Sequence, residues 1–192
     1  KYKPNKFQTY EDEIQFLISH EKRNNFIKNL SIDLKGNTLI LFSRVEAHGK
    51  VLFELINKNV DEGRKVFFIH GGVDAQDREN VRAICRVSAD NGSNYTACVL
   101  AAKGTFSTGI NIKNLHNVIF ASPSKSRIRN LQSIGRVLRK GKDKTKAKLY
   151  DIADDLTSGS RKNYTLNHFI ERVKIYVQEQ FNYDIISIDI KD

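Results

Sequence analysis

The chain has 192 residues and a formal net charge of +10, with 40% hydrophobic and 28% charged residues. This size and balance fit one globular domain and exclude a disordered chain, and no apolar run approaches the ~18 residues of a membrane span. The sequence does not open with a charged-then-apolar signal pattern, and Cys85 and Cys98 lack partners at zinc-like spacing, so we expect a reducing, cytosolic setting without disulfides. Because the sequence contains no Met, we expect it to begin inside a longer polypeptide.

Strand-like and helix-like stretches alternate along the chain. Amphipathic stretches at residues 10–20 and 22–30 predict two helices before the first strand. Five short runs, most of them continuously apolar, predict parallel strands covered on both faces: 38–43, 66–70, 97–101, 117–121 and 148–152. Amphipathic stretches between them predict helices at 46–58, 74–87 and 126–139. This alternation predicts a doubly wound, mainly parallel α/β sheet with helices on both faces, which binds ligands at the carboxyl ends of its strands.

The last part of the chain predicts a short helical appendage. Asp154 and Asp155 end the fifth strand region and are interpreted as a turn or cap. A helix is expected over 166–181, and the alternating Ile186, Ile188 and Ile190 predict a final strand. We therefore divide the chain into a helical lead-in, a main domain and an appended helix and strand, at residues 1–36, 37–156 and 157–192.

The sharpest motif is the segment QSIGRVLR at residues 132–139. On a helix, Gln132, Arg136 and Arg139 are four and three residues apart and share one face. Two neighbouring guanidiniums repel each other and need an anion or carboxylates as partners, and phosphate suits the guanidinium fork. Residues 122–148 also hold ten Lys or Arg against one acid, which suits a polyanionic partner. The alternative is a basic helix face that binds a phosphate backbone or only solvent.

Three other segments carry groups that can hold phosphates. The loop LAAKGTFSTGINI at residues 100–112 offers backbone N–H groups and small hydroxyls after a predicted strand. The segment LILFSR ends a predicted strand with Ser43 and Arg44, and HGG at residues 70–72 follows another strand and precedes Arg78. Taken alone, each of the last two is ordinary α/β turn chemistry.

Taken together and in this order, these segments resemble motifs IV, V and VI of superfamily 2 helicases. The chain is similar to the second, RecA-like motor domain of that family. The stretches RNNFIKNLS, LILFSRVEAHG, GTFSTGINIKNLHNVIFASPSKS and QSIGRVLRKG resemble the recombination-associated DNA helicases of T-even phages, and the resemblance covers nearly the whole chain. It implies ATP-driven remodelling of branched DNA, such as stalled forks and recombination junctions, in the cytoplasm of the host cell.

The resemblance also implies a role for each candidate residue. Arg139 would be an arginine finger and Arg136 a second contact to the γ-phosphate of ATP. Gln132, Gly109 and Asn111 would face the nucleotide, although many family members carry Asp where Asn111 stands. The residues implied as contacts to DNA are Ser43, Arg44, His70, Arg78, Thr105 and Ser107.

The sequence lacks the groups that bind the nucleotide itself. It contains no Gly-x-x-x-x-Gly-Lys-Ser/Thr loop and no strand that ends convincingly in paired acids. ATP and Mg²⁺ are therefore expected to be held mainly by an N-terminal RecA-like domain of the same polypeptide, and this chain is expected to be inactive alone. No residue of this chain is predicted as a metal ligand.

Two other classes of function remain open at this point. A non-catalytic module could use the same basic helix to bind DNA or RNA, and an effect of the arginine pair on ATP turnover would separate it from a motor domain. A small-molecule α/β enzyme is disfavoured, because the sequence has no recognisable nucleophile–base arrangement and no Gly-x-Gly-x-x-Gly turn.

Overall fold

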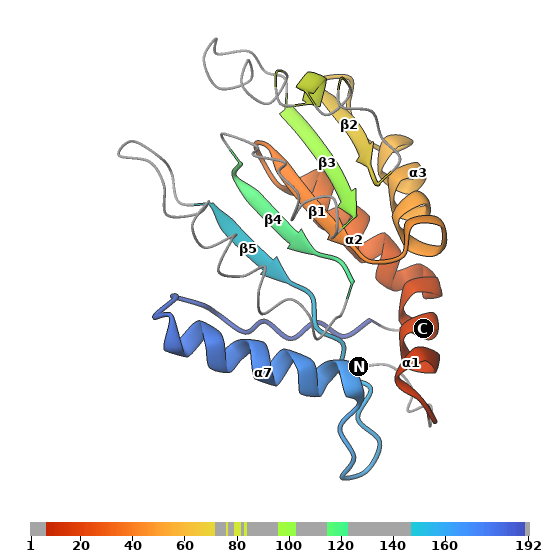
Figure 1. Cartoon of the computed structure of the whole chain (residues 1–192), viewed down its shortest axis with the longest axis vertical. Coiled ribbons are helices and arrows are strands. Elements are labelled where there is room, and N and C mark those ends of the chain that lie inside the picture. Colours follow the sequence, from red (N-terminus) through yellow and green to blue (C-terminus); the bar gives the residue numbers. More distant parts are fainter. Residues whose placement is uncertain are drawn as a thin grey trace.

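A five-stranded sheet forms the centre of the molecule (Figure 1). The computed structural model describes residues 7–71, 76, 79–81, 83, 96–102, 115–122 and 147–190. Neighbouring strands pair in parallel, in the order β2-β3-β1-β4-β5. The strands are β1 (Thr38–Phe42), β2 (Arg64–Ile69), β3 (Thr96–Ala102), β4 (Asn117–Phe120) and β5 (Lys148–Asp151). The five predicted strands and the parallel α/β sheet are thus confirmed.

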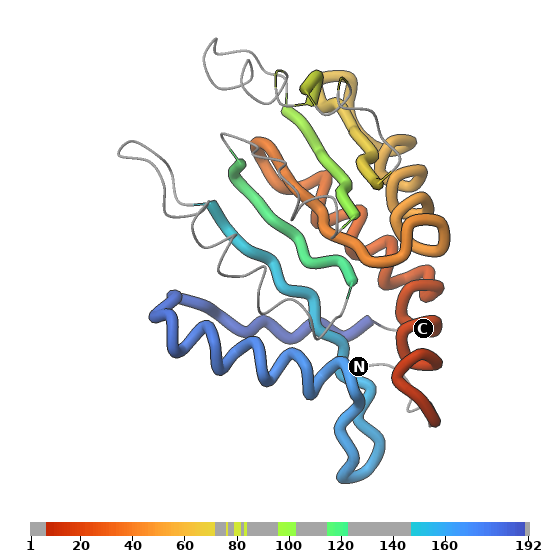
Figure 2. The backbone as a smooth tube through the Cα atoms, viewed as in Figure 1, coloured from red at the N-terminus to blue at the C-terminus, as the bar shows by residue number. Residues whose placement is uncertain are grey.

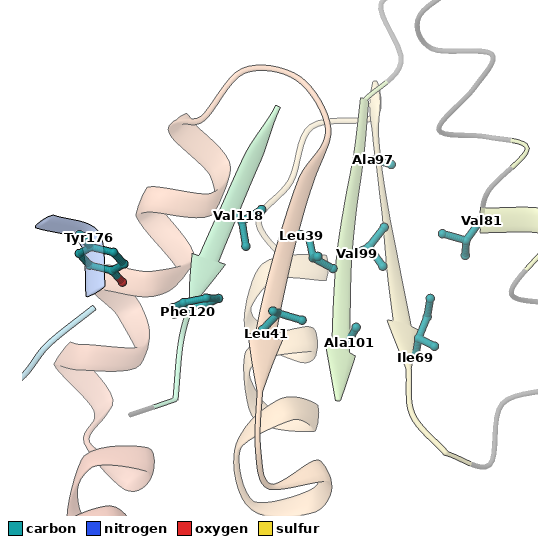
Figure 3. Packing of buried hydrophobic residues seen from close by; sticks show 10 residues of the cluster. All are labelled: Leu39, Leu41, Ile69, Val81, Ala97, Val99, Ala101, Val118, Phe120 and Tyr176. Carbon is teal, nitrogen blue, oxygen red and sulfur yellow. The ribbon is translucent and has the colours of Figure 1, made fainter. Parts of the chain in front are cut away.

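Each central strand buries apolar side chains on both faces of the sheet, as its continuous apolar run predicted. Successive residues of β1 separate the two layers, because Leu39 and Leu41 pack on one face and Ile40 and Phe42 on the other. Figure 3 shows the first layer, which continues across β3 and β4 and includes Val81 from the region after β2.

Helices cover both layers of the core. The helices α2 (Glu21–Asp33) and α3 (Val51–Asn57) cover one face, and α7 (Tyr164–Gln178) reaches the other, while α1 (Tyr10–Ser19) lies beyond the sheet (Figure 1). The helices predicted before β1 and near the end of the chain are confirmed. Within the helix predicted at 74–87, the described residues are helical, and the helix predicted at 126–139 lies outside the described residues. Among the described helices, none is long and apolar enough to cross a bilayer.

A buried carboxylate joins the first and last described helices. Glu13 of α1 is fully buried and accepts the backbone N–H groups of Tyr164 at 2.8 Å and Thr165 at 2.7 Å, in the first turn of α7. N–H groups in the first turn of a helix lack partners within the helix, and a carboxylate there also interacts favourably with the helix dipole. Glu13 therefore caps α7 from a helix about 150 residues earlier in the chain.

A second buried cluster fixes α7 to β5. Arg172, 1% exposed, donates through Nε and Nη2 to the two carboxylate oxygens of Asp151 at 2.6 and 2.9 Å. The hydroxyl of Tyr176 donates to the same carboxylate at 2.6 Å. Burial, and after it the negative charge of Asp151, raises the pKa of Tyr176 above its ordinary value. The phenol therefore stays protonated and keeps donating to Asp151.

The predicted final strand at 186–190 is wrong. After α7 the chain turns back along the helix (Figure 2), and residues 181–190 have no regular secondary structure. Phe181 packs against the Tyr176 ring, whereas Ile186 is 80% exposed. Alternating apolar residues form a strand only where a neighbouring strand supplies hydrogen bonds, and this segment lies beside a helix.

Cys98 is a small residue of the core. It is a free, fully buried cysteine on the α2 and α3 face of the sheet. Burial raises the pKa of its thiol to about 11, an effect that the nearby Arg64 only partly offsets. The thiol is therefore neutral at physiological pH and has no role as a nucleophile.

The helix predicted at 46–58 begins with a π-helical turn, η1 (Val45–Lys50), before α3. The N–H of Gly49 donates to the carbonyl of Arg44, five residues earlier, at 2.9 Å. This wider turn brings Gly49 against the end of β1, where a Cβ would overlap the ring of Phe42. Glycine is therefore required here for the close approach of η1 to β1.

Replacing Gly49 with alanine is expected to destabilise the domain by about 1–3 kcal/mol, because overpacking a core forces backbone or ring shifts. Chemical denaturation measures the change in free energy of unfolding. Gly71→Ala is the matched control, since a Cβ at Gly71 meets no atom within 4 Å. Equal losses for the two variants would contradict the steric argument.

Candidate functional site

The carboxyl ends of the five strands lie level along one edge of the sheet. Phe42, at the end of β1, is in register with Ala102, at the end of β3. On the other side, the last residues of β4 and β5, Phe120 and Asp151, are paired with each other. In parallel α/β sheets this carboxyl edge is where ligands bind. The segments that hold the two sharpest motifs leave β3 and β4 at this edge.

Ser43 and Arg44 follow β1 at the carboxyl edge, and both are exposed, as expected for contacts to a ligand. The backbone N–H of Ser43 donates to the hydroxyl of Ser122 at 3.1 Å. Arg44 reaches back to α1, where its Nη2 lies 2.7 Å from each carboxylate oxygen of Glu11. The side chains of this pair are about half exposed, at 49% and 52%. The pair therefore remains accessible to a competing anion.

His70 follows β2 at the same edge and is half-buried, with its ring 5.5 Å from that of Phe68. Because β3 lies between β2 and β1, His70 is separated from Ser43 by one strand. The structure thus places the three described candidates, Ser43, Arg44 and His70, at one edge, with β3 between the strand that His70 follows and the strand that Ser43 and Arg44 follow. The remaining candidates lie outside the described residues: Arg78, Thr105, Ser107, Gly109, Asn111, Gln132, Arg136 and Arg139.

Sequence reasoning missed a buried polar network at this edge. The side chains of Asn24, His48 and Ser122 are 3%, 0% and 2% exposed. Asn24 Oδ1 lies 3.2 Å from His48 Nε2, and His48 Nδ1 lies 3.0 Å from Ser122 Oγ. A polar residue in the interior of a predicted helix, such as His48, gives no signal of such a partner. Its partners lie 24 and 74 residues away in the chain.

Sequence reasoning also missed a buried ion pair. Arg23 of α2 is fully buried, and its Nε donates to Asp154 Oδ1 at 2.8 Å. Its Nη2 donates to the carbonyl of Ala121, directly after β4, at 2.9 Å. The interpretation of Asp154 as a turn or cap residue is therefore wrong, whereas Asp155 does accept the N–H of Thr157 in a turn. One signal in the sequence was available: Arg23 lies four residues before the buried Ile27 on α2. Residues at this spacing share a helix face, so Arg23 could have been expected on the buried face.

Within the part of the chain that the structure describes, no three side chains of His, Cys, Asp or Glu gather as metal ligands. Four acidic groups near the carboxyl edge are engaged by basic side chains: Asp151 by Arg172, Asp154 by Arg23, Glu11 by Arg44 and Glu46 by Lys50. The edge therefore presents exposed cationic and hydroxyl groups, which suit an anionic ligand such as phosphate.

Comparison with known sequences gives two matches. A family model described as the helicase conserved C-terminal domain matches residues 21–141, more than half of the chain. The ATP-dependent DNA helicase UvsW of Enterobacteria phage T4 is 37% identical over 198 aligned positions, which cover 96% of this chain and 38% of that protein. The chain thus spans well under half the length of this curated relative.

Solved structures show the same fold. The crystal structure of T4 UvsW matches with a TM-score of 0.74 at 38% identity, over 93% of this chain and 37% of that chain. The C-terminal domain of the DEAD-box protein Dbp5 matches with a TM-score of 0.56 at 15% identity, over 84% of this chain and 82% of that domain. The expected RecA-like arrangement of the parallel sheet is therefore confirmed.

Proposed function

The chain belongs to the family of helicase conserved C-terminal domains, and from that premise we propose that it is the second motor domain of an ATP-dependent DNA helicase. Its task in the full helicase is to remodel branched DNA, such as forks and recombination intermediates. The observation that most supports this proposal is the 37% identity to the phage T4 DNA helicase over 96% of this chain. Residues 37–156 are its motor domain proper, with residues 1–36 as a lead-in and 157–192 as an appendage.

The layout of the carboxyl edge supports separate contacts to two ligands, DNA and ATP. Ser43 and Arg44 are exposed at the end of β1, where they suit contacts to a DNA backbone. The segment that follows Ser122 carries Arg136 and Arg139, and it begins beside them, because the Ser122 hydroxyl accepts the N–H of Ser43. DNA contacts and the arginine pair would therefore act from neighbouring points of one edge.

The chemistry proposed for this domain is electrostatic. Arg139 acts as an arginine finger and Arg136 as a second contact, so that both stabilise the charge that builds on the γ-phosphate during phosphoryl transfer. Gln132, Gly109 and Asn111 contact the nucleotide on the same side. The residues that hold the DNA backbone are Ser43, Arg44, His70, Arg78, Thr105 and Ser107. Opening and closing of the two motor domains around ATP then shifts these DNA contacts along the strand.

The partners of the domain follow from this scheme. ATP and Mg²⁺ are bound mainly by an N-terminal RecA-like domain of the same polypeptide, and DNA, branched or single-stranded, lies across both domains. The setting is the cytoplasm of the cell that a phage infects, without a role for a membrane.

Remodelling of a synthetic replication fork by a polypeptide that joins both motor domains tests the proposed function. ATP-dependent conversion of the fork to its reannealed products is expected, with no conversion in the presence of a non-hydrolysable ATP analogue. DNA binding without ATP-dependent conversion would contradict the proposal and favour a non-catalytic binding module.

The contact between Arg44 and Glu11 gives a prediction about DNA affinity. Glu11→Gln frees Arg44 for phosphate and is expected to tighten DNA binding by about 2- to 5-fold at low salt, the range that an exposed ion pair of up to ~1 kcal/mol allows. Fluorescence anisotropy with a labelled single strand measures the change. Glu62→Gln removes the same charge from an exposed position before β2, at the opposite edge. An equal gain for both variants would mean that only net charge matters.

A further inference from the structure

A line of buried hydrogen bonds runs from α2 through η1 to the carboxyl ends of β1 and β4. Asn24 Nδ2 donates to the carbonyl of Ile18 at 2.8 Å, and Asn24 Oδ1 faces His48 Nε2 at 3.2 Å. His48 Nδ1 lies 3.0 Å from Ser122 Oγ, and Ser122 Oγ accepts the backbone N–H of Ser43 at 3.1 Å. The line thus ends on Ser43, a residue that the proposed function places on DNA.

The donors along this line can be assigned from the hydrogen bonds that each side-chain atom is able to donate or accept. Since Asn24 Oδ1 can only accept, we assign His48 the tautomer that carries its proton on Nε2. Nδ1 then accepts, and the hydroxyl of Ser122 donates to it. Ser122 thereby uses its proton on His48 and a lone pair on Ser43, so its rotamer is set from both sides. A hydroxyl held in this way fixes the backbone that carries it.

The residue before Ser122 is held as well. Arg23, anchored on Asp154, donates to the carbonyl of Ala121 at 2.9 Å, and the N–H of Ala121 donates to the carbonyl of Leu41 at 3.1 Å. Ala121 and Ser122 are therefore positioned by three separate elements: α2, η1 and β1. Directly after them comes the segment 123–146, which contains Arg136 and Arg139.

We propose that Ser122 and His48 are positioning residues that couple DNA contact at Ser43 and Arg44 to the placement of the arginine pair. A phosphate bound at the end of β1 fixes the Ser43 backbone, and the Ser122 hydroxyl passes that restraint to the start of the arginine segment. Arg23 and Asp154 supply the rigid support against which Ser122 is held. This inference rests on the proposed function and adds a named route by which DNA stimulates ATP turnover.

Two substitutions of His48 separate positioning from mere stability. An asparagine amide occupies nearly the place of Nδ1 and can keep the bond to Ser122, whereas a glutamine amide reaches the place of Nε2 and can keep the bond to Asn24. Each variant loses one buried hydrogen bond, so both are expected to lower the melting temperature by similar amounts. Only the glutamine variant loses the link to Ser122.

The readout is the ratio of kcat for ATP with and without single-stranded DNA, in the polypeptide that joins both motor domains. His48→Gln is expected to lower this ratio by about 2- to 30-fold, the range of coupling through such networks, with KM for ATP unchanged. His48→Asn is expected to keep the ratio near that of the unaltered protein. Ser122→Ala should behave as His48→Gln does, and Ser122→Thr, which keeps the hydroxyl, should restore the ratio.

Failure of this inference is distinguishable from failure of the proposed function. If DNA stimulates turnover and Arg139→Ala abolishes it, but the two His48 variants give the same ratio, the positioning role is overturned and the network is only structural. If turnover does not respond to DNA, or survives Arg139→Ala, the proposed function itself is overturned. A melting temperature within a few degrees for the two variants keeps the comparison valid, and Ser122→Thr provides the second route if either His48 variant fails to fold.

Discussion

Replacing Arg139 with alanine in a polypeptide that joins both motor domains is expected to lower ATP turnover by about 10³-fold or more. An arginine finger acts on charge that develops only in the transition state, so its loss appears in kcat and not in ground-state binding. Steady-state ATP hydrolysis measures the loss, and anisotropy with labelled DNA is expected to show nearly unchanged affinity.

Two variants control this experiment. Lys58→Ala removes the same charge from an exposed residue after α3 and is expected to leave turnover unchanged. Arg139→Lys keeps the charge but not the planar fork, and it is expected to resemble Arg139→Ala more than the unaltered protein. Loss of DNA affinity with normal turnover would reverse the assignment and make Arg139 a backbone contact.

Replacing Asp151 with alanine is expected to destabilise the domain by about 3–5 kcal/mol, because it leaves a buried guanidinium without its carboxylate. Arg172 loses two charge-assisted hydrogen bonds, and the hydroxyl of Tyr176 loses its acceptor. For a chain of this size the melting temperature should fall by about 6 to 20 °C. Differential scanning calorimetry measures this shift.

The matched control lies on the same helix. Glu171 forms an ion pair with Lys174 at 2.7 Å, but the two side chains are 57% and 67% exposed. Glu171→Ala is therefore expected to cost less than about 1 kcal/mol. A similar cost for the two substitutions would mean that the buried cluster does not hold α7 on the sheet.

The elements that local pattern alone determines were predictable. Continuous apolar runs predicted the five strands, because strands covered on both faces bury every side chain, as β1 does from Thr38 to Phe42. The parallel arrangement then placed Ser43, Arg44 and His70 at one edge, since carboxyl ends of parallel strands share that edge. The prediction of a strand at 186–190 was wrong, because this segment has no neighbouring strand with which to form hydrogen bonds.

Contacts between distant residues were not predictable from pattern. Arg23 and Asp154 are 131 residues apart, and nothing in either local sequence specifies the other as its partner. His48 lies inside a predicted helix, in the same π-helical turn as Gly49, which lies against Phe42. Such groups become visible only when packing brings α2, η1 and the strand ends together.

The roles of Arg136 and Arg139 came from motif spacing and from resemblance, and they stay a prediction. Their segment begins directly after Ser122, at the carboxyl edge of the sheet, which is the position that the motor proposal needs. Two carboxylates near this edge, Asp151 and Asp154, are already paired with Arg172 and Arg23.

A crystal structure of the joined motor domains with ADP, Mg²⁺ and aluminium fluoride would test the central claim most directly. The guanidinium of Arg139 is predicted to lie within hydrogen-bonding distance, about 2.7–3.2 Å, of the phosphoryl mimic, with Arg136 beside it. Two guanidiniums paired instead with carboxylates of this domain, or turned away from the nucleotide, would contradict it.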